Sequence, residues 1–333
     1  MKLSLVAGGV ALLLATAGSD ADSRKYFSQV ATIPLATVGG RIDHFAIDLK
    51  GARLFVCALG NNSVEVLSLD SNAVIHSLRG LSEPQGVSYV PEVNRIYVTN
   101  AGSGECDVFE GTSYSLLRRI DLGGDADNIH YDASAHRMLV SAGNGIGIID
   151  ISSDSLVGKV ELPGHPEGFV FEEKSSRVFV NVPLPSRSAF VVDRARIAVT
   201  DRWPIGGPLS DAFSNFPISL DETRGRLFVG TRVPALLKVI DVSSGKIVAD
   251  LGIDGDADDI SYDSKRQRMY VSCGTGFLDV FQQLDPDHYK EAARVPTAAG
   301  GRTSLWVPEM NRLFIAIPRR GSQVAEIRVY EAE

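Results

Sequence analysis

Seven segments of this 333-residue chain share an arginine followed by a short apolar run. The residues ten positions before these arginines include several that can bind a ligand or a metal ion. They are Asp43, Gln85, Asp127, Glu167, Phe216, Asp258 and Arg302. Asn128 follows Asp127, His44 follows Asp43, and His165 precedes Glu167 by two residues. If the fold brings equivalent positions of a repeat together, this set crowds carboxylates and imidazoles into a small volume. We treat the seven residues, with His44 and Asn128, as a candidate ligand-binding site.

Crowded carboxylates repel one another, so such a site raises some carboxyl pKa values or attracts a cation. Oxygen ligands favour Ca²⁺, Mg²⁺ or Mn²⁺, and an added imidazole shifts the preference toward Mn²⁺ or Zn²⁺. The candidate metal ligands are Asp43, His44, Asp127, His165, Glu167 and Asp258. The alternative interpretation is that these aspartates cap tight turns by binding nearby backbone amides.

The spacing of the repeat predicts the architecture. The arginines stand at positions 53, 95, 137, 177, 226, 268 and 312, with intervals of 42, 42, 40, 49, 42 and 44 residues. Each begins a strand-like run such as Leu54-Phe55-Val56. Short strands repeated every 40–45 residues or so are typical of propeller blades. We therefore predict an all-β, seven-bladed β-propeller whose blades are four-stranded antiparallel sheets lining a central channel.

The last unit supplies only three strands before Glu333. We expect the N-terminal segment to add the fourth strand, which closes the ring by pairing the two ends of the chain. The propeller then spans residues 26–333 as one domain. Its blades run at about 39–84, 85–127, 128–167, 168–213, 214–258, 259–302, and 303–333 with 26–38.

Two segments interrupt the regular spacing. Residues 203–213 form an insertion within the 49-residue interval, and insertions in repeat proteins collect in loops, often on a binding face. Asp285–Glu291 is expected to form a single capped helical turn.

The N-terminus has the features of a secretory signal peptide. Lys2 precedes the apolar run Leu3–Ala15, and Ala15-Thr16-Ala17 offers small residues for cleavage. We predict a signal peptide over residues 1–17, a flexible mature N-terminus over 18–25, and a periplasmic or secreted protein with no transmembrane anchor after cleavage.

Composition and missing motifs exclude several classes. The net charge of -8 makes nucleic acid an unfavourable partner. The sequence has neither a haem-attachment motif nor a Walker-type nucleotide motif, and it lacks the Gly-x-Ser-x-Gly and His-Glu-x-x-His signatures of hydrolases. Any cofactor is therefore unknown, with a divalent cation as the one candidate.

Tyr97-Val98-Thr99-Asn100 is the tetrapeptide that names the YVTN-repeat propellers, and all seven units follow the surrounding pattern. The chain resembles the exported, YncE-like YVTN family over almost its whole mature length. The resemblance implies a seven-bladed ring with a central channel. It transfers no catalytic residue, because propellers support binding, scaffolding and several kinds of catalysis.

Loops between second and third strands are expected on the same face as the candidate site, and an outer set of arginines there would suit an anionic ligand. These loops contribute Asn61, Asn62, Arg187, Arg232, Arg319 and Arg320. Phe216, Trp203 and Trp306 either form an apolar wall beside the site or pack in the core.

The function we predict is binding of a small molecule or a periplasmic protein through the channel face, by a monomer without turnover. One alternative is a lactonase-type hydrolase or metal-assisted lyase, with His44 or His165 as general base. The other is a scaffold or subunit of a periplasmic redox complex.

Overall fold

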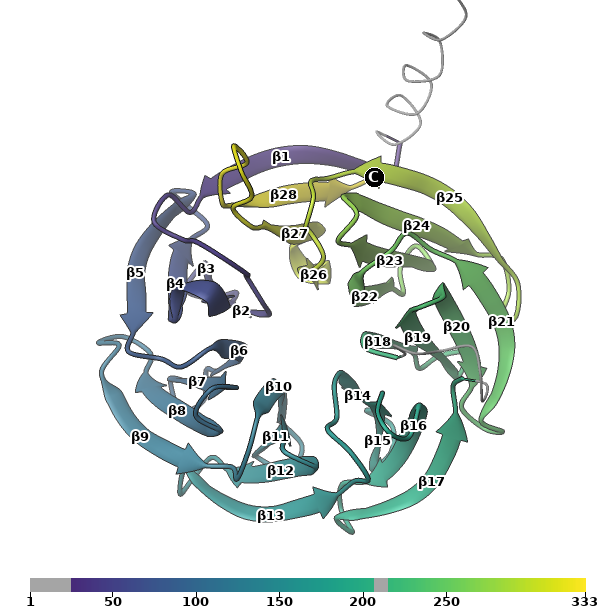
Figure 1. The fold of residues 1–333 in the computed structure, drawn as a ribbon, viewed down its shortest axis with the longest axis horizontal. Coiled ribbons are helices and arrows are strands. Elements are labelled where there is room, and N and C mark those ends of the chain that lie inside the picture. The colour runs from purple at the N-terminus through teal and green to yellow at the C-terminus, as the bar shows by residue number, and fades with distance from the viewer. Residues whose placement is uncertain (1–24, 207–214) are drawn as a thin grey trace, which may run out of the picture.

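The computed structural model of the chain describes residues 25–206 and 215–333. These residues form seven four-stranded antiparallel sheets arranged as a ring around a central channel (Figure 1). The helices of the described residues are two single 3₁₀ turns, η1 (Leu59–Asn61) and η2 (Pro308–Met310). The prediction of an all-β, seven-bladed propeller is confirmed.

Within each of the first six blades, the strands follow one another from the channel to the periphery in chain order. Their bounds are β2 (Phe45–Asp48), β3 (Arg53–Ala58), β4 (Ser63–Ser68), β5 (Ala73–Arg79); β6 (Pro84–Val90), β7 (Arg95–Asn100), β8 (Glu105–Glu110), β9 (Leu116–Asp121); β10 (Ala126–Asp132), β11 (Arg137–Ala142), β12 (Gly145–Asp150), β13 (Ser155–Glu161); β14 (Phe169–Phe171), β15 (Arg177–Val182), β16 (Ser188–Asp193), β17 (Ala198–Pro204); β18 (Ile218–Asp221), β19 (Arg226–Arg232), β20 (Ala235–Asp241), β21 (Lys246–Gly252); and β22 (Ala257–Asp263), β23 (Arg268–Cys273), β24 (Phe277–Gln283), β25 (Tyr289–Pro296).

The seventh blade joins the two ends of the chain. It contains β26 (Ser304–Val307), β27 (Arg312–Ile317) and β28 (Glu326–Ala332), and its outer strand is β1 (Phe27–Pro34). Strand β1 pairs antiparallel with β28, with Phe27 opposite Ala332 and Pro34 opposite Glu326. The predicted closure is therefore confirmed, and it removes the free edge that β28 would otherwise present.

Apolar side chains of the second strands interlock neighbouring blades. Successive side chains of a strand point to opposite faces of its sheet. In each second strand, the residue two positions after the repeat arginine therefore faces the next blade. The residues one and three positions after the arginine face the preceding blade. Phe55 accordingly packs with Ile96 and Val98 of the next blade. The same combination continues around the ring: Tyr97 with Met138 and Val140, Leu139 with Val178 and Val180, Phe179 with Leu227 and Val229, Phe228 with Met269 and Val271, Tyr270 with Leu313 and Ile315, and Phe314 with Leu54 and Val56.

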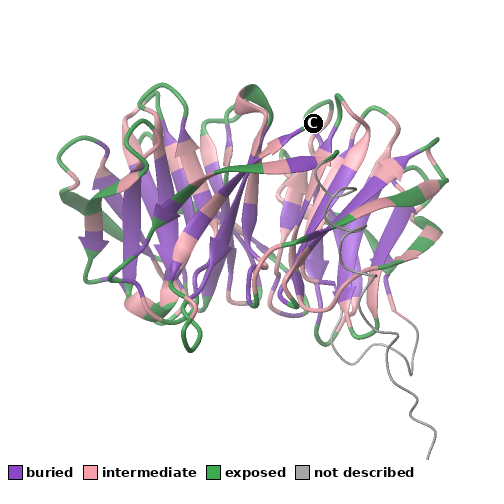
Figure 2. Cartoon of the chain, turned by 90° about the horizontal axis from the view of Figure 1, so that it is seen from above, coloured by how far each residue is buried: buried purple, intermediate pink, exposed green. Residues whose placement is uncertain are grey.

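The outer strand of every blade is set off by a register shift against its inner neighbour. The shifts fall at Val66/Leu67, Val108/Phe109, Ile148/Ile149, Val191/Val192, Val239/Ile240, Val280/Phe281 and Gln29/Ala31. Bulges of this kind increase strand twist. The outer strands accordingly sweep around the periphery (Figure 1), where they carry many of the exposed residues (Figure 2).

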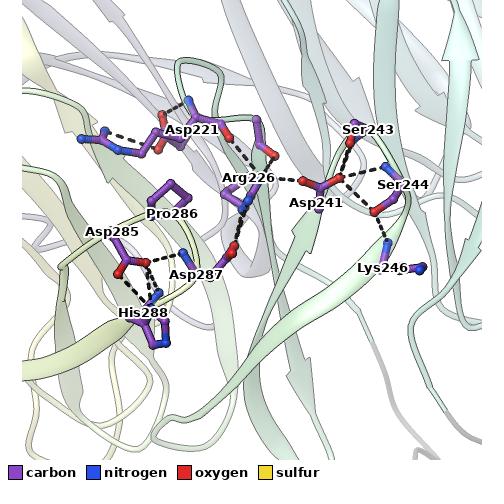
Figure 3. Close-up of polar contacts among 12 residues, drawn as sticks. Asp221, Arg226, Asp241, Ser243, Ser244, Lys246, Asp285, Pro286, Asp287 and His288 are labelled. Atoms are coloured by element: carbon purple, nitrogen blue, oxygen red, sulfur yellow. Dashed lines mark hydrogen bonds and ion pairs between the residues drawn. The ribbon is translucent and has the colours of Figure 1, made fainter.

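Five of the seven repeat arginines tie neighbouring blades together: Arg53, Arg95, Arg177, Arg226 and Arg268. Arg177 donates two hydrogen bonds to Glu172, at 2.6 and 2.7 Å, and one to the carbonyl oxygen of Val242 in the next blade, at 3.0 Å. Arg226 makes a similar link to Asp241 of its own blade and Asp287 of the next, at 2.7 and 2.8 Å (Figure 3). These arginines stabilise the ring and have no part in the candidate site.

Among the described residues, Arg137 and Arg312 depart from this pattern, and Arg137 shows how. The carboxylate at the end of its own first strand, Asp132, pairs instead with Arg194 of the next blade, at 3.2 Å. Across residues 25–206 and 215–333, no ion pair or hydrogen bond of the Arg137 guanidinium is found. The chain therefore contains its own comparison between a repeat arginine that is bonded and one that is not.

Replacing Arg177 with methionine is expected to lower the free energy of unfolding by about 2–3 kcal/mol, because it leaves the Glu172 carboxylate without its charged donor. Arg137→Met is the matched control and should change it by no more than about 0.5 kcal/mol. Urea unfolding of both variants measures the difference. Equal losses in the two variants would contradict the proposed role of the repeat arginines.

The prediction of a helical turn at Asp285–Glu291 is wrong, because this segment contains no helix. Residues 285–288 form the turn between β24 and β25, and Oδ1 of Asp285 accepts hydrogen bonds from the backbone amides of Asp287 and His288, both at 2.9 Å. An aspartate commonly caps a turn in this way without a helix. Of the predicted insertion, residues 207–213 lie outside the described residues, as does the predicted signal peptide.

Candidate binding site at the channel mouth

The first strands of all seven blades surround a cavity of about 410 Å³ in the central channel. Its charged lining residues are Arg41, His44, Asp127, Glu167, Asp258 and Asp259, with His130 among the uncharged ones. Its aromatic lining residues are Phe45, Tyr89, Tyr131, Phe169, Phe216 and Trp306. The channel therefore combines a charged region with an apolar wall.

The seven repeat-equivalent residues are brought to one level because each lies at the start of a first strand or just before it. Asp127 and Asp258 are the second residues of β10 and β22, whereas Glu167 stands two residues before β14. Backbone hydrogen bonds connect this level across blades, from the amide of His44 to the Gln85 carbonyl at 3.1 Å, and from Gly168 to Phe216 at 3.3 Å. We call this level of the channel the mouth.

His44 stands between two carboxylates at the mouth. Its Nε2 lies 3.5 Å from Oδ1 of Asp43, and its Nδ1 lies 3.7 Å from Oδ1 of Asp259. Burial disfavours the charged imidazole, but Asp259 and Asp43, helped by Asp127 and Asp258, raise the pKa of His44 to about 9. Burial likewise raises the pKa of Asp259 to about 7, although the His44 charge acts in the opposite direction. His44 is therefore a cation at neutral pH.

Asp43 lies behind this histidine and is fully buried. Arg41 approaches its Oδ2 to 2.5 Å as an ion pair, but neither carboxylate oxygen accepts a hydrogen bond of good geometry from a described residue. Burial raises the pKa of Asp43, against the opposing effect of His44 and Arg41. The side chain therefore acts on the mouth through His44 and Arg41 without lining the cavity.

Two arginines hold Asp258. Arg302 Nε lies 2.9 Å from its Oδ2, and an Nη2 of Arg232 donates a hydrogen bond to its Oδ1. Arg302 also donates to Asp256, at 2.8 Å. The Arg232 guanidinium lies over the Phe216 ring, 4.0 Å from the ring centroid, which adds a cation–π contact. This side of the mouth is a neutralised and well-connected network.

The opposite side carries a less compensated cluster. Ligand atoms of Asp127, His165 and Glu167 all lie within 4.8 Å of one another. Burial raises the pKa of Asp127 well above its ordinary value, and His44 offsets only part of that effect. Burial also raises the pKa of Glu167, partly opposed by His165. Of the six predicted metal ligands, these three are brought together as one cluster.

The predicted ligand-binding residues separate into two groups. His44, Asp127, Asn128, Glu167, Phe216 and Asp258 line the cavity. Asp43, Gln85 and Arg302 do not line the cavity. Each contacts a residue at the mouth from behind: Asp43 lies beside His44, Gln85 accepts a hydrogen bond from Arg41 at 3.4 Å, and Arg302 pairs with Asp258. Equivalent positions in the repeat therefore share a level but not an orientation.

Sequence reasoning did not select Asp259, Arg41 or His130. Asp259 directly follows Asp258, so its place one residue after a repeat-equivalent position is the signal that would have found it. His130 lies deeper in the channel with its ring 4.7 Å from that of Phe169. Enclosure by the protein, together with the nearby His44 charge, lowers the pKa of His130 to about 4, so it is neutral at pH 7.

Of the predicted aromatic residues and loop arginines, some reach the channel and others do not. Phe216 and Trp306 line the channel, but Trp203 is buried in the core, 5.4 Å from the Phe179 ring. Arg232 reaches the mouth, whereas Arg319 donates to the carbonyl oxygens of Ala36 and Val38 and holds the N-terminal segment in place. The apolar wall therefore lacks Trp203, which the interlocking core requires.

In its fold, the chain is similar to a solved chain of hydrazine synthase from Kuenenia stuttgartiensis, with a TM-score of 0.73. The shared feature is the fold. Sequence identity is 17 %, and the alignment covers 88 % of this chain and 98 % of that chain. No protein-family model and no curated protein matches the sequence. These comparisons support the β-propeller and identify no family within it. Within the described residues, no helix is long and apolar enough to cross a membrane.

The charge on His44 predicts a pH dependence of stability. Its pKa of about 9 in the folded chain lies above the ordinary 6.5, so its stabilising contribution is complete below pH 6.5 and is lost as the pH rises through 9. The free energy of unfolding of the wild type, relative to His44→Gln, should fall by roughly 3 kcal/mol over that range. Unfolding at a series of pH values in metal-free buffer measures it. Parallel curves for the two proteins would show that His44 is not charged by its neighbours.

Proposed function

We propose that this protein is a binding module that takes a small molecule into its central channel. The observation that carries the proposal is the cavity of about 410 Å³, enclosed by seven first strands and lined at its mouth by charged groups. Pockets for small molecules have volumes of roughly 300–1,000 Å³ and combine apolar walls with a few polar groups that orient the ligand.

The chemistry of the lining favours a ligand rich in hydrogen-bond donors. Carboxylates at the mouth accept hydrogen bonds from hydroxyl or ammonium groups, and four line the cavity together with the cationic His44: Asp127, Glu167, Asp258 and Asp259. Phe216 and Trp306 offer ring faces to a sugar ring or to a cation. Sugars and small amines are therefore the classes we propose.

The setting of this activity stays a prediction from the sequence. Membership of the YVTN-repeat family, removal of residues 1–17, and a periplasmic or secreted location agree with one another and form part of the proposal. The lactonase or lyase alternative and the redox-complex subunit are kept as competing hypotheses. Turnover of a bound sugar lactone would support the first, and co-purification of a redox partner would support the second.

Blocking the channel tests the proposal. Ser261 lines the cavity in β22, and Ser261→Trp is expected to fill part of it and abolish ligand binding. The measurement is isothermal titration calorimetry of ligands selected from a panel of sugars, uronates and amines by thermal shift. Loss of more than about tenfold in affinity is expected, because a ring in the cavity excludes the ligand.

The matched control is Ser71→Trp, which adds the same side chain at an exposed turn between β4 and β5. It should bind like the wild type. Equal binding by both variants would place the ligand outside the channel, and a panel in which nothing binds the wild type would remove the proposed ligand classes.

A further inference from the structure

We infer that Asp127, Glu167 and His165 form a binding site for one divalent transition-metal ion at the channel mouth. The inference rests on the proposed function for its role, since the ion would lie where the ligand enters, but the binding of the ion itself is independent of any ligand.

The first argument is the convergence of donors from neighbouring blades. Asp127 belongs to β10 of the third blade, and His165 and Glu167 precede β14 of the fourth. Their ligand atoms lie within 4.8 Å of one another. Donors bound to one tetrahedral ion at about 2.0–2.2 Å lie about 3.3–3.6 Å apart, so the three side chains need to close by at most roughly 1.5 Å to complete the site.

The second argument is the orientation of His165. Its Nδ1 lies 2.9 Å from the carbonyl oxygen of Gly143, and because a carbonyl only accepts, Nδ1 must carry the proton. The neutral ring then has its lone pair on Nε2. Histidines that bind metals usually donate their other N–H to a carbonyl or carboxylate in this manner. The backbone of the third blade thus prepares His165 as a ligand.

The third argument is an unpartnered carboxylate oxygen. Asp127 is only 5 % exposed, and no described residue donates a hydrogen bond to its Oδ1. A buried carboxylate without a partner is unfavourable by several kcal/mol as an anion, so such groups are usually paired or bind metals. A cation between Asp127 and Glu167 would remove this penalty and the repulsion between the two side chains.

The arginines of the mouth do not meet this need. Arg232 and Arg302 are held by Asp256 and Asp258, and Arg41 is held by Asp43. On the open side of the cluster, Asp125 Oδ2 lies 3.9 Å from Nε2 of His165. Its exposed carboxylate offers a fourth donor, and water or the bound small molecule can complete the coordination.

The donor set selects the kind of ion. Two carboxylates and one imidazole suit Mn²⁺ or Zn²⁺ better than Ca²⁺, which prefers six to eight oxygen ligands, or Mg²⁺, which keeps most of its water. By the general order of affinities, Zn²⁺ should bind more tightly than Mn²⁺.

The test is metal binding by the purified, tag-free chain without any small-molecule ligand. After treatment with EDTA and dialysis, the wild type is titrated with Zn²⁺, Mn²⁺, Mg²⁺ and Ca²⁺ and bound metal is counted by elemental analysis. We expect one Zn²⁺ or Mn²⁺ per chain, binding at least tenfold tighter than Mg²⁺ or Ca²⁺, and a higher melting temperature in the bound form.

Asp127→Asn and His165→Gln should each lose most of this binding. His288→Gln is the matched control, because His288 also stands beside an aspartate, Asp285, at 2.9 Å, but at an exposed turn far from the cluster in sequence and on another blade. It should bind like the wild type. Circular dichroism checks that each variant is folded; if Asp127→Asn is not, Glu167→Gln takes its place.

X-ray absorption of the Zn²⁺-bound protein gives a second readout, which should show one imidazole among oxygen ligands. A wild type that binds no stoichiometric ion, or triad variants that bind as well as His288→Gln, would overturn the inference. An ion that binds while no sugar or amine does would retain the metal site and remove the proposed function. Binding of a sugar or amine by a protein that binds no ion would retain the proposed function and remove the metal site.

Discussion

The interlock between neighbouring second strands is the constraint on which the rest of this protein depends. Each pair of neighbouring blades shares one core. In it a large side chain of one second strand, such as Phe55, packs with two apolar residues of the second strand of the next blade, Ile96 and Val98. Because every core joins two blades, no blade buries its apolar faces alone. The ring must therefore close, and Phe314 packing on Leu54 and Val56 completes it.

Closure is what creates the mouth. The seven first strands lie inside the ring, so residues at their starts come to one level around a common space whatever their charge. The fold thus supplies the free energy that holds Asp127, Glu167 and Asp258 close together. Part of the repulsion is relieved by Arg232 and Arg302 around Asp258. On the other side, burial is the main cause of the raised pKa values of Asp127 and Glu167, and neighbouring carboxylates add to it.

The propeller fold does not require a particular sequence. The hydrazine synthase chain shares the fold over 88 % of this chain at a sequence identity of only 17 %. An apolar pattern repeated along the second strands is enough to specify a propeller, because many apolar residues satisfy it. The channel residues are under no such requirement. They are where one propeller differs in function from another.

The sequence by itself determined the blade count, the strand order and the closure of the ring, because a period-two apolar pattern repeated at each arginine is a local signal. It also indicated which positions share one level, including Asp43, Asp127, Glu167 and Asp258. Only the tertiary structure decided that Asp43 lies behind the cavity, that Arg232 and Arg302 hold Asp258, and that Asp127 meets His165. These outcomes depend on side-chain orientation and on contacts between blades, which spacing along the chain does not encode.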